Sequence, residues 1–211
     1  MRVARRLPRE RVPYVAAWGV NRALYFTGRL PYDMFRYPQN PISLLPAYNL
    51  WPEFRARYPC WAELAEALYD LGAVNEAEHL CYEALQRLGD QPEIIQRLVI
   101  LSIAKGRTQA ARALLRSLRD DLVYGAWARK YLKLMDKDPE LESDPEVVRL
   151  RSARPLEDEV GWYGCMGLTR LLLERNPHNR MAFEYRMAQC LLDRDLDAVV
   201  DNLARIVDFD Y

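Results

Sequence analysis

Histidines and paired cysteines are scarce in this chain of 211 residues. It has two histidines, His79 and His178, and its four cysteines form no CxxC pair. A zinc site needs a full set of ligands at recognisable spacing, and a nucleophilic cysteine needs a base within reach. His79 and Cys81 point about 200° apart around an expected helix, so we expect an exposed His79 and a packed Cys81. The sequence therefore predicts no metal site and no cofactor.

Long apolar runs are also missing. The longest uncharged stretch near the start, residues 12–21, is far shorter than the roughly 20 apolar residues of a membrane-spanning helix. The same stretch fits a secretory signal poorly because no cleavage site of small residues follows it. We expect a cytoplasmic protein if the chain is complete, and a membrane-associated one if it is a fragment of a longer protein.

Charge is balanced overall but placed unevenly. Lysine plus arginine and aspartate plus glutamate each number 30. Within residues 1–60, however, ten arginines stand against three acidic residues, a net charge of +7. Five of those arginines crowd before Pro13, and such a cluster can contact water or acidic lipid headgroups. The sequence predicts proximity to a membrane ahead of nucleic acid, and we expect no nucleic-acid partner.

The composition of the chain changes between residues 31 and 59, where proline and aromatic residues are frequent. Six prolines in this stretch exclude any long helix, and seven aromatic residues make it unlike a solvated linker. We predict an ordered arm that packs on the rest of the chain or on a partner. Together with a basic helix at 14–28 that ends at Gly28, it forms the first predicted region, 1–59; the second is a helical domain over 60–211.

A repeat of 34 residues organises the start of that helical domain. Gly72 and Gly106 are 34 residues apart, and each precedes an alanine, Ala77 or Ala111, by five residues. Apolar residues recur at three- and four-residue spacing on both sides of each glycine. This pattern predicts two antiparallel helical hairpins, at about 60–89 and 92–119.

The first hairpin resembles a tetratricopeptide repeat. The residues that carry the resemblance are Trp61, Leu64, Ala65 and Leu68, then Gly72, Ala77, Cys81 and Ala84. Ile95, Leu98, Gly106 and Ala111 fill the corresponding positions of the second hairpin. The resemblance implies an all-α fold of stacked hairpins, a short solenoid whose groove is lined by the first helix of each hairpin.

The strict register ends after the second hairpin. Glu140 and Pro145 stand where a third unit would have its glycine and its small residue, so we expect a degenerate unit over 122–175 and a final hairpin at 178–208. The C-terminal segments 176–177, 182–185 and 191–192, together with 21–25, 27–30 and 34–39, are also similar to the C-terminal soluble part of a poorly characterised bacterial family of multi-spanning membrane proteins. That resemblance implies no activity.

The predicted groove has a mixed, rather acidic surface. Its candidate partner-binding residues are Glu63, Glu66, Tyr69, Asp70, Glu93, Gln96, Arg97 and Ile100. They lack the lysine and asparagine donors with which some tetratricopeptide proteins hold a peptide carboxylate, so we expect no such clamp. A basic or apolar segment of a protein or peptide partner suits these side chains better.

These observations favour a non-catalytic interaction or scaffold module. The alternative is a small-molecule-binding or enzymatic domain with its site near Gly161–Gly167. Three glycines at three-residue spacing are costly within a helix. This indicates that the helix begins after them, that they allow close packing, or that backbone amides at a helix start hold an anion. Trp162, Tyr163 and His178 are the side chains that such a site would use.

Overall fold

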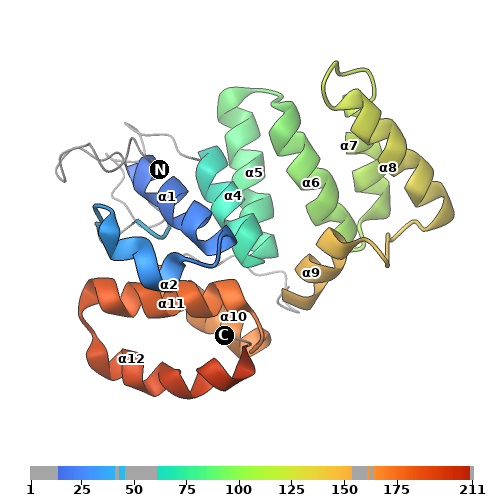
Figure 1. Cartoon of the computed structure of the whole chain (residues 1–211). Coiled ribbons are helices and arrows are strands. Elements are labelled where there is room, and N and C mark those ends of the chain that lie inside the picture. Colours follow the sequence, from blue (N-terminus) through green and yellow to red (C-terminus); the bar gives the residue numbers. More distant parts are fainter. Residues whose placement is uncertain (1–13, 41–42, 46–60, 154–160, 162–163, 210–211) are drawn as a thin grey trace. The chain divides into compact units, whose positions relative to one another are not determined.

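The chain is all-α. A computed structural model describes residues 14–40, 43–45, 61–153, 161 and 164–209, and this part of the chain contains helices and no strand (Figure 1). The arginine cluster before Pro13, most of the proline- and aromatic-rich arm, and the side chains of Trp162 and Tyr163 lie outside the described residues. None of the described helices is both long and apolar enough to cross a bilayer.

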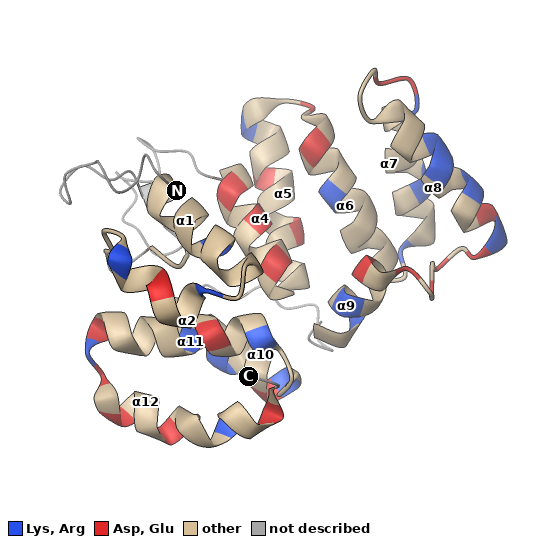
Figure 2. Cartoon of the chain, in the orientation of Figure 1, with Lys and Arg blue, Asp and Glu red and all other residues tan. Residues whose placement is uncertain are grey.

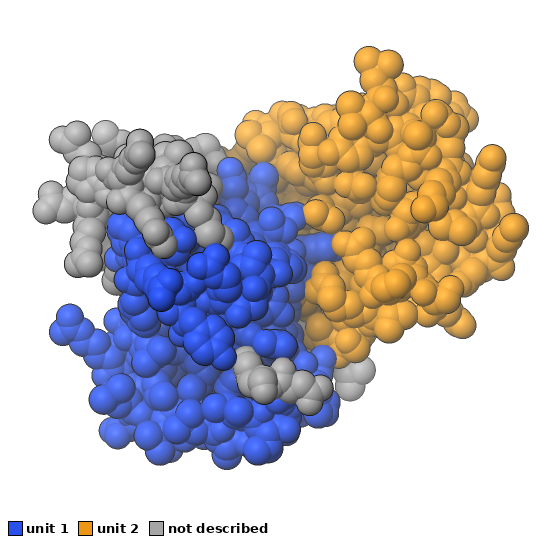
Figure 3. All heavy atoms as spheres, viewed as in Figure 1, with its two compact units in different colours: residues 1–71, 161–211 blue, residues 72–160 orange. Residues whose placement is uncertain are grey.

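The fold divides into two compact units (Figure 3). Unit 1 is made of Met1–Leu71 together with Gly161–Tyr211, and unit 2 is Gly72–Val160. The boundary differs from the expected one at residue 59, because the N-terminal helices belong with the C-terminal ones. It also divides the expected hairpin 60–89 between the two units.

Unit 1 is built around one central helix, α11. Its elements are α1 (Tyr14–Phe26), α2 (Leu30–Asp33), η3 (Met34–Arg36), α4 (Trp61–Leu71), α10 (Cys165–Arg175), α11 (Arg180–Asp193), α12 (Leu196–Leu203) and η4 (Ala204–Asp208). Helices α2, α4, α10 and α12 all pack on α11. The side chain of Asn179 caps α11 by accepting from the Ala182 amide, and its amide group donates to the Leu71 carbonyl oxygen at 2.9 Å.

Unit 2 is a run of successive helices around α6. Its elements are α5 (Val74–Leu88), α6 (Pro92–Ala104), α7 (Thr108–Leu118), α8 (Gly125–Lys137) and α9 (Pro145–Ala153). Helix α6 packs on α5, α7 and α9, while α8 packs on α7. Residues 98–104 of α6 are all buried, which is the property of a helix that is apolar all round and enclosed by neighbours.

Glycine ends the helices that the repeat predicted. Gly72 follows α4 with φ of 80°, and Gly106 follows α6 with φ of 72°. Residues with a Cβ rarely adopt this left-handed conformation. The expected helix ends at both glycines are confirmed, as is the end of α1 before Gly28.

The degenerate region 122–175 differs in detail from the prediction. Helices α8 and α9 occupy its first part, and Asp144 caps α9 by accepting from the amides of Glu146 and Val147. Of the alternatives for the three glycines, the structure shows a helix that begins after the first two, at Cys165, with Gly164 as its N-terminal cap residue. The helix therefore contains Gly167 alone, so Gly164 adds no cost within it.

Candidate functional site

The acidic groove residues on α4 are engaged within their own unit. The guanidinium of Arg22 donates to Glu66 Oε1 at 2.9 Å and to Asp70 through both Nε and Nη2. The hydrogen bond to Asp70 raises the pKa of Arg22 above its usual range. Tyr69 on the same helix is only 2% exposed. The expectation that Tyr69 faces outward is wrong, and Arg22 already neutralises the two carboxylates that were assigned to a partner.

The remaining groove residues differ in exposure. Glu63 on α4 and Gln96 and Arg97 on α6 are half-buried, and Glu93 is exposed. Arg97 Nη1 lies 3.5 Å from Glu146 Oε1. Ile100 is 1% exposed and belongs to the core of unit 2, so its expected place on the surface is also wrong. The groove stays a prediction, because α4 and α6 belong to different units.

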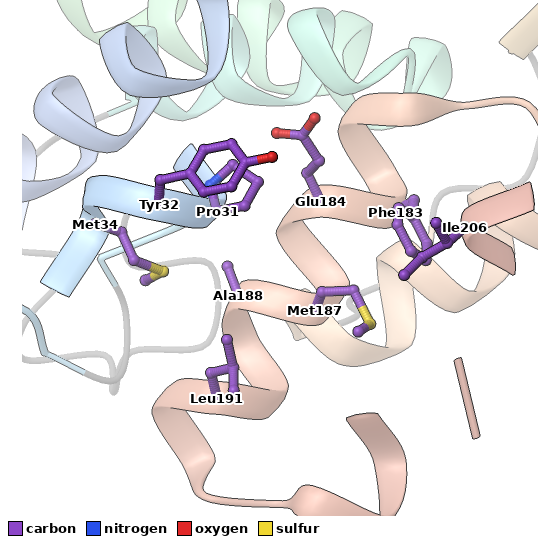
Figure 4. Close-up of a pocket in the computed structure, with 9 residues that line it drawn as sticks. All are labelled: Pro31, Tyr32, Met34, Phe183, Glu184, Met187, Ala188, Leu191 and Ile206. Atoms are coloured by element: carbon purple, nitrogen blue, oxygen red, sulfur yellow. The ribbon is translucent and has the colours of Figure 1, made fainter. Parts of the chain in front are cut away.

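An apolar cleft lies within unit 1. It has a volume of about 310 Å³ and lies between α2, α11 and η4 (Figure 4). The residues that line it are Pro31, Tyr32, Met34, Phe183, Glu184, Met187, Ala188, Leu191 and Ile206. Seven of these nine carry neither a hydroxyl nor a charge, so the cleft suits an apolar occupant.

Of the two polar residues of the cleft, Tyr32 lies at its exposed rim and Glu184 is a buried residue of its wall. Figure 4 shows the Tyr32 hydroxyl and the Glu184 carboxylate on the same side of the cleft. The side chain of Tyr32 is 73% exposed. Glu184 Oε1 accepts from Arg180 Nε at 2.8 Å, so Glu184 is an ion-paired wall residue. The cleft can hold apolar side chains and offers a phenol and a neutralised carboxylate beside them.

Exposed apolar side chains continue from the cleft along α12 and η4. Leu196, Val200, Leu203 and Val207 are 66%, 64%, 44% and 87% exposed. Leu196, Val200 and Leu203, spaced four and three residues apart, lie on one side of α12, and Val207 follows in η4. We call these four residues the α12 stripe. The opposite side contacts the rest of unit 1: Asn202 is buried, Ala198 and Val199 are half-buried, and Asn202 Oδ1 accepts from Arg186 Nε at 3.0 Å. Helix α12 therefore exposes most of its large apolar side chains.

The α12 stripe was missed by sequence reasoning. The periodicity of residues 196–207 indicated a helix and was interpreted as half of a final hairpin. The burial of Asn202, which shows which side of α12 faces its unit, is visible only in the structure. Periodicity alone gives the apolar side without saying whether anything covers it.

Comparison with known protein families places the chain in one of them. Residues 4–209 match the profile of DUF6057, a family of unknown function. The chain belongs to DUF6057. No curated protein and no solved structure matches it. The DUF6057 description carries no activity, so the function of this member must be argued from its own residues.

The glycine-rich alternative site of this DUF6057 chain is only partly described. Cys165, which follows Gly164, is half-buried, and desolvation raises the pKa of its thiol to about 12. A nucleophilic cysteine needs the opposite shift. His178 is exposed, with Nδ1 3.4 Å from the Asp208 carbonyl oxygen. Among the residues that the structure describes, no group of histidine, cysteine and acidic side chains could hold a metal ion.

The histidine and cysteine on α5 differ in burial. Cys81 is 1% exposed, as expected for a packed thiol. His79 is half-buried, whereas the sequence predicted an exposed ring. Nearby, Glu78 accepts from Lys105 Nζ at 2.7 Å and from Arg107 Nη1 at 3.0 Å, and the Lys105 side chain is 4% exposed. This cluster of one carboxylate and two cations stabilises unit 2.

Proposed function

We propose that this chain is a non-catalytic module that binds a protein partner through unit 1. The observation that carries the proposal is the apolar cleft between α2, α11 and η4, together with the exposed apolar side chains beside it. Contiguous exposed apolar surface is uncommon on soluble proteins except where another molecule binds. The partner covers this surface and leaves the ion-paired parts of unit 1 in place.

The residues at the cleft are of the types that protein interfaces favour. Tyr32 and Phe35 are 73% and 55% exposed on α2 and η3, and Met34 and Met187 line the cleft. Aromatic residues and methionine are enriched at protein interfaces relative to the rest of the surface. Methionine also adapts its shape to different neighbours. These features favour a protein surface over a small polar substrate as the occupant.

The same proposal includes a scaffold of tetratricopeptide-like hairpins. Its support is the sequential packing of α5 on α6, α6 on α7 and α7 on α8, with a left-handed glycine between α6 and α7. Helical solenoids bind partners along surfaces that successive repeats build. In this proposal unit 2 acts as a rigid support, and unit 1 carries the docking surface.

Site-specific photocrosslinking tests the proposed function. A photoreactive phenylalanine analogue is placed at Tyr32, on the rim of the cleft, in the protein expressed in its native host. We expect a discrete covalent adduct with another polypeptide after irradiation, detected by gel mobility and mass spectrometry. The matched control places the analogue at Tyr82, which is 46% exposed on unit 2, and we expect no adduct there.

Two results would contradict the proposal. If the Tyr32 variant is folded by circular dichroism but gives no polypeptide adduct, the cleft does not bind a protein partner. An adduct with a small molecule in place of a polypeptide would favour a ligand-binding role for the cleft.

A further inference from the structure

The outward side of α12 combines apolar and acidic residues in adjacent rows. The α12 stripe runs from Leu196 on α12 to Val207 on η4. Asp197 and Asp201 lie about 100° around the axis of α12 from Leu196 and Val200, and Asp208 follows Val207 in η4. We call these three aspartates the acidic flank. All three are exposed, and the structure records no ion pair for them within its described residues.

The acidic flank belongs to a wider negative region. Residues 193–209 contain five aspartates and two arginines. Asp195 caps α12 by accepting from the Ala198 amide at 3.0 Å, so the helix N-terminus already offsets its charge. Arg186, which donates to Asn202, lies on the buried side of α12. Figure 2 shows several acidic segments along α12.

We propose that the α12 stripe and the acidic flank bind a basic amphipathic helix of a partner protein. This inference rests on the proposed function and adds the chemistry of the partner. The apolar residues of that helix, spaced four, three and four apart, cover the stripe. Lysine or arginine residues one position from its apolar row face the acidic flank, which fixes orientation and excludes acidic competitors.

Charge also selects against the other occupants of an apolar helix face. Two copies of this chain that paired stripe to stripe would bring two acidic flanks together, and like charges across an interface cost free energy. An anionic membrane surface repels the same three aspartates. A basic helix satisfies both the apolar stripe and its charged border.

The geometry sets the size of the partner segment. From Leu196 to Val207 the stripe covers twelve positions, or about 18 Å at the helical rise. Ile206, which lies next to Val207, also lines the apolar cleft. A partner helix on the stripe therefore lies beside the cleft, where the segments flanking that helix can enter.

Synthetic helices provide a defined probe for this surface. One fluorescent peptide of about 20 residues carries leucines at the stripe spacing with lysines along one border, and a matched peptide carries glutamates in place of those lysines. Binding to the full chain is measured by fluorescence anisotropy. We expect the lysine peptide to bind at least tenfold more tightly than the glutamate peptide, with a difference that shrinks as salt screens the charges.

Charge-swap variants connect that preference to the acidic flank. In the double variant Asp197→Lys/Asp201→Lys, we expect the preference to reverse toward the glutamate peptide. The matched control, Asp90→Lys/Glu142→Lys, makes the same change of charge at two exposed positions of unit 2 and leaves the preference unchanged. Val200→Asp, in the middle of the stripe, is expected to weaken the binding of both peptides. Circular dichroism checks that each variant is folded.

The following results would contradict the inference that the α12 stripe and the acidic flank bind a basic helix. Equal binding of the two peptides, or a preference that the double charge swap leaves unchanged, rules out the acidic flank as the selective element. Dimerisation of the chain in sedimentation experiments that Val200→Asp abolishes assigns the stripe to a second copy. If the peptides fail while Tyr32 still crosslinks to a polypeptide, this inference is wrong and the proposed function stands; if Tyr32 yields no adduct, the proposed function itself fails.

Discussion

Helices α8 and α12 differ in the kinds of side chain that they bury and expose. Each packs against one principal neighbour, α7 for α8 and α11 for α12. Helix α8 buries Ala128, Tyr131 and Met135, and it exposes a row of basic residues that Figure 2 shows in blue. Helix α12 instead buries Asn202 and exposes Leu196, Val200 and Leu203.

The difference separates a helix that stabilises its unit from one whose apolar side is available to a partner. Three of the four lysines in the chain, at positions 130, 133 and 137, lie on the exposed side of α8. Lysine is depleted at protein interfaces because its ammonium group is strongly hydrated. The composition of α8 keeps its surface in water, whereas that of α12 favours burial against another surface. Substitutions on the two helices should therefore have unequal effects.

The largest effect is expected from truncating the core residue of α8. Met135 is 0% exposed, so Met135→Ala removes buried contacts and leaves a cavity, at a cost of about 2–4 kcal/mol. The corresponding truncation on α12, Leu203→Ala, changes stability by less than about 0.5 kcal/mol because Leu203 is 44% exposed. Urea denaturation followed by circular dichroism measures both. Equal losses would show that α12 stabilises unit 1 as much as α8 stabilises unit 2.

An intermediate effect is expected from replacing the buried polar residue of α12. Asn202 accepts from Arg186 Nε at 3.0 Å and donates to the Ala198 carbonyl oxygen at 2.7 Å. Asn202→Leu removes both hydrogen bonds and leaves Arg186 Nε without this acceptor, which costs about 1–2 kcal/mol. Val200→Asn, the reverse exchange on the exposed side, should stay within about 0.5 kcal/mol. If the leucine variant is the more stable of the two, the Asn202 side of α12 does not face α11.

A smaller effect concerns the phenol of α8. Tyr131 donates to Asp144 Oδ2 at 3.1 Å, and Tyr131→Phe removes this hydrogen bond at a cost of about 1 kcal/mol at neutral pH. Burial, followed by the nearby charge of Asp144, raises the pKa of Tyr131 to about 12. The folded state therefore holds the proton more tightly than the unfolded state, whose tyrosine pKa is about 10.

This pKa shift gives a pH window. The contribution of Tyr131 is fully present below about pH 10 and is lost as pH rises toward 12. The alkaline decline in stability should be less steep in the Tyr131→Phe variant, as measured by denaturation at several pH values. Helix α12 contains no tyrosine, so Val200→Asn should retain the decline of the unsubstituted chain. An identical alkaline limb in the phenylalanine variant would contradict the shift.

The smallest effect on stability is expected from a lysine substitution on α12, which should nevertheless change the apolar surface of the helix clearly. Val200→Lys places on α12 the residue type that covers α8, and its effect on the free energy of unfolding should stay within about 0.5 kcal/mol. Binding of an apolar fluorescent dye should fall, because the stripe is interrupted. Lys133→Gln on α8 is the control and should change neither quantity. Unchanged dye binding in Val200→Lys would mean that the stripe is not the apolar surface that the dye senses.

Local signals were sufficient to predict the helices themselves. Gly72 and Gly106 mark the ends of α4 and α6, and Pro92 marks the start of α6, because glycine and proline act on the backbone where they stand. Periodicity likewise identified Cys81 as a packed residue. The all-α class follows from these features alone, without knowledge of the tertiary contacts.

Long-range pairing explains what the sequence did not reveal. Glu66 and Asp70 were predicted to line the groove. Their partner, Arg22, lies 44 and 48 residues earlier in the chain, and no local pattern shows such a distant pairing. Ile100 was placed outside because a helix enclosed by three neighbours shows no clear polar side. The cleft forms where α2 packs on α11, and these helices are separated by about 150 residues in the sequence. No local sequence pattern indicates such a long-range contact.

The divided sequence of unit 1 has a consequence for biosynthesis. Its first part ends at Leu71 and its second begins at Gly161, with the whole of unit 2 between them. At translation rates of about 5–20 residues per second, α1, α2 and α4 wait several seconds or more for α11 to be made. During that interval the side chains of Leu24 and Leu68, both 0% exposed in the finished fold, lack their final cover. The first part of unit 1 is thus synthesised before its packing partners exist, whereas the sequence of unit 2 is continuous.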